Sequence, residues 1–370
     1  MKILCVIDSL GSGGAQRQMV NLACGLKAKG HIVELFLYFP DLDFLRSEID
    51  AVGIPVYEVT NVRGFSFNVI WRLAKLYRSG RFDGVICFLD APNIYAELAK
   101  LLALSGVKVV ASERSSFMNE RKSIFNKIKR WPHMLANYVV ANSYTHADWL
   151  RNNYWIGKKI KTIYNGYPLR LGADVSMFKD SPSNLLLLIL GRIDTGKNGL
   201  KTLQALALFY QKNGYCPTVL WAGRQEKDPS SLRERNQIEE LLTQNPEIAN
   251  HWHFLDERRD VADLLKQADG LIHVSLYEGL PNAVCEAFVA ARPVIASNVC
   301  DHPKLVEDGI RGILCDPLSP ESICEAMERF VLLPVKDRQQ MGRNARAYAE
   351  QYLTIDRMVA DYEALILDAR

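Results

Sequence analysis

Two glutamates, Glu278 and Glu286, stand eight positions apart in a stretch whose residue types suit ligand binding. A Gly-Leu-Pro-Asn turn, residues 279–282, follows Glu278 and leads into a segment with a helical pattern, and a strand-like segment, Gly270–Val274, comes just before. A glutamate about two turns into a helix faces the same side as the residues near its start, so two carboxylates and several backbone N–H groups can meet one molecule. Such a set fits a ligand with hydroxyls at both ends and phosphate between them, as in a nucleotide-sugar. The alternative is a strand, turn and helix with two solvated glutamates.

A second loop, Gly191–Asn198, carries two cations after an apolar segment. Arg192 offers a planar fork of donors and Lys197 a compact charge, a pair that suits a diphosphate. Placed cations stabilise the negative charge that grows on a leaving diphosphate. Two solvated loop cations are the alternative.

A glycine-rich loop, Gly11–Gln16, follows the first predicted strand. Gly13 and Gly14 would let the backbone approach a ligand closely, and the next helix N-terminus favours an anion. Because the loop lacks the GxGxxG spacing, it supports a dinucleotide site only weakly, and a tight strand-to-helix turn is the alternative.

The composition is that of a globular protein with two cores. The 370 residues suit two domains, and 48% hydrophobic with 24% charged residues fits a soluble protein. The net charge of +3 gives no nucleic-acid signature. Eight scattered cysteines without a CxxC pair predict a reduced, cytosolic protein with no disulfide framework or zinc site. We expect no bilayer-spanning segment, because the longest apolar run falls far short of the ~20 residues required.

Short apolar segments alternate with helical patterns along the whole chain, which predicts parallel sheets covered on both faces. Six strands are predicted in each half of the chain. They are Ile3–Asp8, Ile32–Tyr38, Val56–Val59, Gly84–Leu89, Val107–Ala111 and Tyr138–Ala141, then Leu185–Leu190, Thr218–Ala222, His253–Leu255, Gly270–Val274, Pro293–Ala296 and Gly312–Leu314. Two such series predict an α/β protein of two Rossmann-like, doubly wound domains, with ligands at the carboxyl ends of the strands.

Domain boundaries follow from a break in periodicity that contains Pro168, Gly172 and Pro182. The prediction is an N-terminal Rossmann-like domain over residues 1–167, a linker over 168–183 and a C-terminal Rossmann-like domain over 184–354. A final helix, residues 355–370, could complete the second domain or pack back onto the first.

Together, the Gly13-Gly14-Ala15 loop, the Gly191-Arg192…Lys197 loop and the Glu278-x7-Glu286 stretch resemble the retaining glycosyltransferases of family four, which have the GT-B fold. The similarity covers nearly the whole chain and includes Asn165-Gly166 and Ala222-Gly223. The two glutamates with the Arg/Lys loop are fairly specific to that family, whereas the glycine loop is not.

This resemblance implies that a sugar moves from a nucleotide-sugar, expected to be a UDP-sugar, to a glycan acceptor with retention and without a metal or other cofactor. The domain over residues 1–167 would bind the acceptor, and the domain over 184–354 would bind the nucleotide-sugar. Arg192 and Lys197 would bind the donor diphosphate, Glu278 would lie by the transferred sugar, and Glu286 would hold the ribose. The remaining donor-binding residues would be Gly13, Gly14, Gly279, Leu280, Pro281 and Asn282.

Two positions depart from the family pattern. Gln16 stands where many relatives have a glutamate, so no chemistry is assigned to it. Many relatives have a histidine after the fifth strand, where this chain reads Ala-Ser-Glu-Arg-Ser, residues 111–115. Because some relatives that build surface polysaccharides carry a similar Glu-Arg element, Glu113 and Arg114 are expected to orient the acceptor or the donor sugar. A local salt bridge is the alternative, and no general base is assigned.

Residues 114–133 hold six cations, and apolar residues recur there at steps of three or four, which is typical of a basic amphipathic helix. Such a face could lie peripherally on anionic lipids or bind a lipid-linked diphosphate, or it could be an ordinary helix with solvated cations. Trp71, Arg72, Lys75 and Arg78 would add to this surface. In the second half, His273 is interpreted as a core histidine and His302 as a candidate cleft residue.

The sequence therefore favours a cytosolic glycosyltransferase, acting on lipopolysaccharide O-antigen, capsule or a glycoprotein glycan. A non-hydrolysing sugar-nucleotide epimerase has the same architecture, but it would need acid/base groups on both sides of the sugar. A non-catalytic nucleotide-sugar-binding protein is the third reading. The sugar, the acceptor, the linkage and the oligomeric state stay open.

Overall fold

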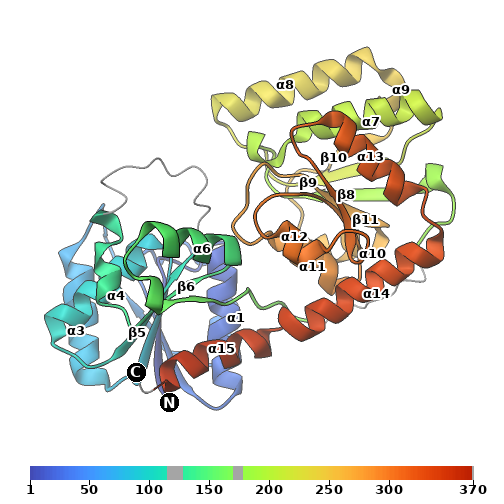
Figure 1. Ribbon diagram of the computed structural model, residues 1–370. Coiled ribbons are helices and arrows are strands. Elements are labelled where there is room, and N and C mark those ends of the chain that lie inside the picture. Colours follow the sequence, from blue (N-terminus) through green and yellow to red (C-terminus); the bar gives the residue numbers. More distant parts are fainter. Residues whose placement is uncertain (115–127, 170–177, 369–370) are drawn as a thin grey trace. The chain divides into compact units, whose positions relative to one another are not determined.

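The computed structural model describes residues 1–114, 128–169 and 178–368 (Figure 1). The chain divides into two compact units. The first unit comprises Met1–Tyr167 and Leu353–Arg370, and the second comprises Pro168–Tyr352.

The first unit is built on a seven-stranded parallel sheet in the order β3-β2-β1-β4-β5-β6-β7. Its strands are β1 (Lys2–Val6), β2 (Ile32–Leu37), β3 (Val56–Glu58), β4 (Gly84–Phe88), β5 (Lys108–Glu113), β6 (Tyr138–Ala141) and β7 (Ile160–Thr162). Its helices are α1 (Gly14–Ala28), α2 (Arg46–Ala51), α3 (Phe67–Gly80), α4 (Asp90–Ala103), η1 (Trp131–Met134), α6 (Tyr144–Asn153), η2 (Gly157–Lys159) and α15 (Ile355–Leu367).

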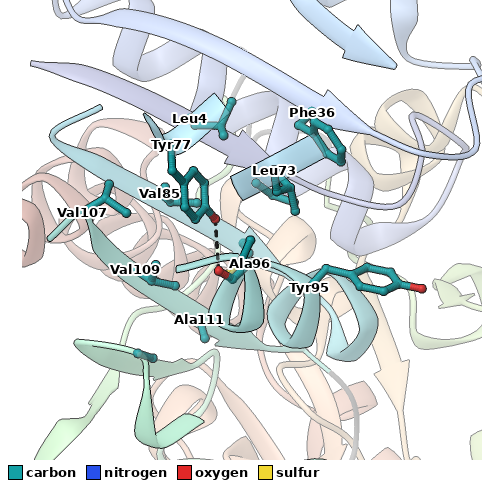
Figure 2. Packing of buried hydrophobic residues seen from close by; sticks show 14 of the residues in the cluster. Leu4, Phe36, Leu73, Tyr77, Val85, Tyr95, Ala96, Val107, Val109 and Ala111 are labelled. Carbon is teal, nitrogen blue, oxygen red and sulfur yellow. Dashed lines mark hydrogen bonds between the residues drawn. The ribbon is translucent and has the colours of Figure 1, made fainter. Parts of the chain in front are cut away.

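Successive residues of β1 face opposite sides of this sheet, as the two-residue period of a strand requires. Leu4 and Val6 join a core with residues of α3, α4 and α6, whereas Ile3 and Cys5 join a core with residues of α1, α2 and α15. Figure 2 shows part of the first core, where the Tyr77 hydroxyl donates to the Ala96 carbonyl oxygen at 3.2 Å. Both faces of the sheet are therefore covered.

The C-terminal helix α15 belongs to the first unit and packs beside α1 (Figure 1). A Cβ atom at Gly25 of α1 would lie 2.6 Å from Val359 Cγ2, so the glycine permits close contact between the two helices. Glu363 adds ion pairs to Lys29 and His31, both at 2.9 Å.

The second unit contains a six-stranded parallel sheet in the order β10-β9-β8-β11-β12-β13. Its strands are β8 (Leu186–Leu190), β9 (Thr218–Ala222), β10 (Trp252–Phe254), β11 (Gly270–His273), β12 (Val294–Ser297) and β13 (Gly312–Cys315). Its helices are η3 (Pro182–Asn184), η4 (Thr195–Lys197), α7 (Gly199–Asn213), α8 (Pro229–Gln244), α9 (Pro246–Ala249), α10 (Val261–Gln267), α11 (Asn282–Val289), α12 (His302–Val306), α13 (Pro320–Val331) and α14 (Val335–Tyr352).

All twelve predicted strands are present, with ends shifted by at most two residues. The sequence analysis missed β7, because a three-residue strand with an exposed lysine in the middle carries little apolar pattern. It also ended β5 too early. The strand runs on to Glu113, because the polar residues at its end find buried partners.

Among the described residues, no helix has both the length and the apolar character needed to cross a bilayer.

Candidate active site

Two adjacent strands of the second sheet, β8 and β11, determine where the candidate site lies. They pair in parallel, with Gly270 opposite Leu187 and Leu271 opposite Leu188. The loops that follow them therefore leave the same edge of the sheet, which is the edge where open α/β sheets bind ligands. The predicted cation and carboxylate residues lie in these two loops.

The loop after β8 turns sharply to bring Lys197 back over the strand. Gly191 has a φ of 139°, which favours glycine, and a Cβ atom there would lie 2.9 Å from Lys197 Cε. Asp194 caps η4 by accepting from the Lys197 backbone N–H at 3.2 Å. The local sequence thus directs the lysine side chain toward the end of β11.

Glu278 is the centre of the site. Lys197 Nζ lies 2.5 Å from Glu278 Oε1, and His273 Nε2 lies 3.1 Å from the same oxygen. The glutamate and lysine side chains are 16% and 18% exposed, so solvent still reaches both. Structure therefore brings together two of the residues predicted to be catalytic, Lys197 and Glu278, with a histidine beneath them.

The charges of this cluster are set by competing effects. Burial favours the neutral form of Glu278, but the Lys197 ammonium and the bond to His273 outweigh it and hold the carboxyl pKa well below its ordinary range. Burial and then the same ammonium lower the pKa of His273. At neutral pH the site consequently contains an ionised carboxylate, an ammonium and a neutral imidazole.

A second histidine supports the first. His302 packs its ring against that of His273, with centroids 5.2 Å apart, and its Nδ1 lies 2.9 Å from the Ser297 carbonyl oxygen. Burial, followed by the neighbouring His273, lowers the pKa of His302 to about 3. The sequence analysis assigned His273 to the core. It is buried, but it also contacts Glu278. His273 is the last residue of β11, and this position at the carboxyl end of a strand could have indicated a place in the site.

Arg192 lies on the same loop as Lys197 but points elsewhere. Its side chain is 63% exposed, and its nearest acids are Asp194 and Glu226, each at 3.5 Å. The side chain is thus held only by loose surface contacts, and its predicted diphosphate contact stays a prediction.

The turn after Glu278 leads into α11, which begins at Asn282 with Pro281 as its N-cap residue. Leu280 and Pro281 are buried, whereas Gly279 and Asn282 are partly exposed. Glu286 lies in the second turn of α11 and is half-buried, and burial raises the pKa of its carboxyl to about 7. Two carboxylates eight residues apart therefore differ sharply in acidity.

The predicted residues Gly13 and Gly14 lie in the first unit, where Gly13 caps α1 and Gly14 begins it. The Gln16 amide donates to Asp8 Oδ1 at 2.9 Å. A Cβ atom at Gly13 would lie 2.1 Å from Gln16 Oε1, so a larger residue there would displace the Gln16 side chain. A role of these glycines in donor binding stays a prediction.

Glu113 has a structural environment that its sequence context did not suggest. Its carboxylate receives Arg130 Nε at 3.2 Å and Nη2 at 3.1 Å, and it lies 2.8 Å from His133 Nε2. His133 Nδ1 lies 2.6 Å from Glu97, another buried carboxylate. These contacts give Glu113 the role of holding residues 130–133, and its contact with an acceptor stays a prediction.

The same contacts correct the interpretation of Arg130. It was counted among the cations of a basic surface over residues 114–133, but it is only 3% exposed, because Glu113 holds it inside the unit. Of the helix predicted over residues 114–133, residues 115–127 lie outside the described residues.

Among the described residues, Glu113 forms its salt bridge with Arg130, and Arg114 contacts other partners. Its guanidinium lies 3.6 Å from the centre of the Phe88 ring. It donates to Ser112 Oγ at 2.9 Å, to the Tyr362 hydroxyl of α15 at 2.8 Å and to Asn165 Oδ1. Arg114 thus links β5 to Asn165, near the end of the first segment of this unit, and to α15, which forms its second segment. Its role toward an acceptor stays a prediction.

Within the described ranges, no group of three or more His, Cys, Asp or Glu side chains is arranged to hold a metal ion.

Comparisons with known proteins identify the family of each half of the chain. The family model for glycosyl transferases group 1 matches residues 177–348, and the model for glycosyltransferase family 4 matches residues 12–171. The first match contains the whole Lys197–Glu278 cluster. Neither model describes an epimerase or a non-catalytic binding protein, so the two alternatives from the sequence are not favoured.

Two relatives align over nearly their full length. The chain is 29% identical to the lipopolysaccharide glucosyltransferase WaaG of Escherichia coli, over 94% of this chain and 93% of that protein. It is 25% identical to an α-1,4-N-acetyl-D-galactosaminyltransferase of Campylobacter jejuni, named for a GalNAc-GalNAc-diNAcBac-PP-undecaprenol substrate, over 95% and 94%.

Solved structures agree on the fold. A glycosyltransferase from Rickettsia africae superposes with a TM-score of 0.82 at 21% identity, covering 100% of this chain and 99% of that one. Anabaena HepE, in complex with UDP and glucose, superposes with a TM-score of 0.77 at 20% identity, covering 98% of both chains. With both domain families matched in order along one chain, this protein belongs to the family-four glycosyltransferases, enzymes of the GT-B fold.

Proposed function

We propose that this enzyme transfers a sugar from a UDP-sugar to a lipid-linked or lipopolysaccharide glycan, with retention and without a metal ion. The observation that carries the proposal is the Lys197–Glu278 contact at the carboxyl edge of β8 and β11. An ammonium beside a carboxylate offers one group for a phosphate and one for a sugar hydroxyl.

The proposed reaction breaks the bond between the anomeric carbon and the diphosphate oxygen. Lys197 and Arg192 stabilise the charge that develops on the leaving diphosphate, as fixed donors do for other developing anions. The acceptor oxygen bonds to the same face of the anomeric carbon, and its proton passes to the leaving phosphate. NMR coupling constants of the anomeric proton test retention, because the product should have the same anomeric configuration as the donor.

The lipid-linked acceptor is proposed from the relatives, whose names include diphospho-undecaprenol and lipopolysaccharide substrates. We propose that the reaction takes place in the cytoplasm, on the inner face of the membrane, where residues 114–133 contact anionic lipid. Ile128 and Trp131, 62% and 52% exposed, support that contact. Arg130 is excluded from it, because its charge is neutralised by Glu113.

A thermal-shift panel of UDP, GDP, ADP and their sugar conjugates tests the donor assignment. A ligand that binds only the folded protein raises the unfolding midpoint by mass action. We expect UDP and one or more UDP-sugars to raise it, with or without EDTA. A shift that is specific to GDP or ADP, or that EDTA abolishes, would contradict the proposed donor or the metal-free chemistry.

The two glutamates are expected to divide donor recognition. Glu286→Gln should weaken binding of both UDP and the UDP-sugar, since the ribose is common to both. Glu278→Gln should weaken the intact UDP-sugar much more than UDP, because only the former carries the transferred sugar. Isothermal titration of both ligands measures this, and equal losses for both ligands in both variants would remove the distinction.

Donor affinity should also depend on pH through Glu286. A carboxyl with a pKa of about 7 is mostly protonated at pH 6 and mostly ionised at pH 8. An acceptor for ribose hydroxyls functions best when ionised, so the UDP-sugar should bind about tenfold more weakly at pH 6 than at pH 8. The UDP-sugar diphosphate has no group that titrates in this range. Glu286→Gln should flatten the dependence, and a wild-type slope that persists in this variant would assign the titration to another group.

A further inference from the structure

A cavity lies in the first unit, near the amino ends of β6 and β7, whereas Glu113 lies at the carboxyl end of β5. Its volume is about 490 Å³, and its polar lining consists of Lys100, Asn137, Lys158, Lys159, Lys161 and Asp368. Lys100 comes near the end of α4, before β5, and the other lysines come before or within β7. We call this cavity the lysine pocket.

Two of its lysines are fixed by the protein itself. Lys100 Nζ donates to the Leu135 carbonyl at 3.2 Å and to Asn137 Oδ1 at 2.7 Å. Lys159 Nζ donates to the carbonyls of Met134 and Ala136 at 2.7 and 2.8 Å. An ammonium has three N–H donors, so each of these lysines uses two in these bonds and keeps a third for a ligand.

The other two lysines are exposed and add charge without such anchors. Lys158 and Lys161 are both exposed at the surface of the pocket, and Lys161 Nζ lies 5.9 Å from the centre of the Tyr138 ring. Among the described residues of the lining, four lysines accompany one acid, Asp368, whose carboxylate accepts from the Tyr138 hydroxyl.

The two anchored lysines, Lys100 and Lys159, are held in a partly buried place where their charges are unfavourable. Burial and then the charge of Lys159 lower the pKa of Lys100, and burial lowers the pKa of Lys159, whereas the buried carboxyl of Glu97 offsets part of the effect on both. An anion placed among the four ammonium groups would relieve the repulsion and satisfy their remaining donors.

We propose that the lysine pocket binds a phosphate-bearing anion of at least two negative charges, of which a diphosphate group is the simplest example. Two fixed lysines would supply directed donors at the base, and the two exposed lysines would close around the rim. This site goes beyond the proposed transferase reaction, because it lies at the amino ends of β5, β6 and β7, whereas the predicted acceptor residues lie at a carboxyl end. The anion could come from a soluble diphosphate or from a lipid headgroup.

The test uses the full chain with Lys197→Ala, which removes the proposed donor-phosphate lysine from the comparison. Inorganic diphosphate is titrated calorimetrically, and vesicles of phosphatidic acid, whose phosphomonoester can carry two negative charges, in phosphatidylcholine are tested by flotation. The pocket variant combines Lys158→Gln and Lys161→Gln in this background. It should bind diphosphate or the vesicles at least tenfold more weakly. The matched control is Lys212→Gln with Lys336→Gln, which removes the same charge from exposed helical positions outside the pocket and outside the basic surface of the first unit.

The two arms distinguish the sources. Loss of diphosphate binding alone identifies a soluble ligand, and loss of vesicle binding alone identifies a lipid headgroup. If the pocket variant binds both probes as tightly as the control, the proposal is wrong. The pocket variant with Lys197 intact should keep the full thermal shift with UDP, so failure of the donor proposal and failure of this one give different results.

Discussion

Replacing Lys197 with alanine should lower the turnover number by about 10²–10³-fold, the loss seen when one fixed donor to a developing anion is removed. The ammonium lies 2.5 Å from Glu278, so the variant loses the proposed phosphate contact and the counter-charge of the carboxylate together. Without Lys197, burial should raise the Glu278 pKa, and neutral Glu278 should become more common near neutral pH. Steady-state kinetics with the donor chosen from the thermal-shift panel measures the effect.

Lys201→Ala is the matched control, because Lys201 lies one turn further along the chain in α7 and makes no contact with Glu278 among the described residues. It should retain activity within about twofold, as expected for a surface substitution away from the site. Lys197→Arg tests the shape of the cation, since a planar fork does not replace a compact charge in a tight site. Wild-type turnover in Lys197→Ala would remove this residue from the chemistry.

Replacing Glu113 with alanine should destabilise the first unit by about 3–5 kcal/mol, the range for breaking a buried ion pair from one side. Arg130 and His133 would then remain buried without their shared carboxylate. For a unit of this size the loss corresponds to about 6–20 °C in the unfolding midpoint. Calorimetry should show the transition of the first unit moving while that of the second stays in place.

Glu48→Ala serves as the control, since its pair with Arg17 is exposed and such pairs contribute about 0–1 kcal/mol. The result also separates the two roles considered for Glu113. A side chain that only orients an acceptor would leave both transitions unchanged when replaced, and activity alone would fall. That outcome would contradict the structural role.

The doubly wound fold was predictable because its signals are local. Leu187–Leu190 is a continuous apolar run, and α7 follows it with a helical pattern, so strand and helix can be recognised within a few residues of each other. Strand β7 was not predictable in this way, because three residues are too few to show an apolar pattern. The extension of β5 to Glu113 was not predictable either, because the partners of Glu113 lie 17 and 20 residues further along the chain.

Residue types and spacing alone determined that Lys197 and Glu278 follow strands and could act on one ligand. Only the tertiary structure decided that they touch, because the contact depends on β8 and β11 being neighbours although Lys197 and Glu278 are 81 positions apart in the chain. The structure also decided that His273 supports Glu278, that Glu113 and Arg130 neutralise each other, and that four lysines share a pocket. Sequence records which side chains can ionise or donate, whereas burial and partners, which set their charge and availability, arise only when distant segments pack together.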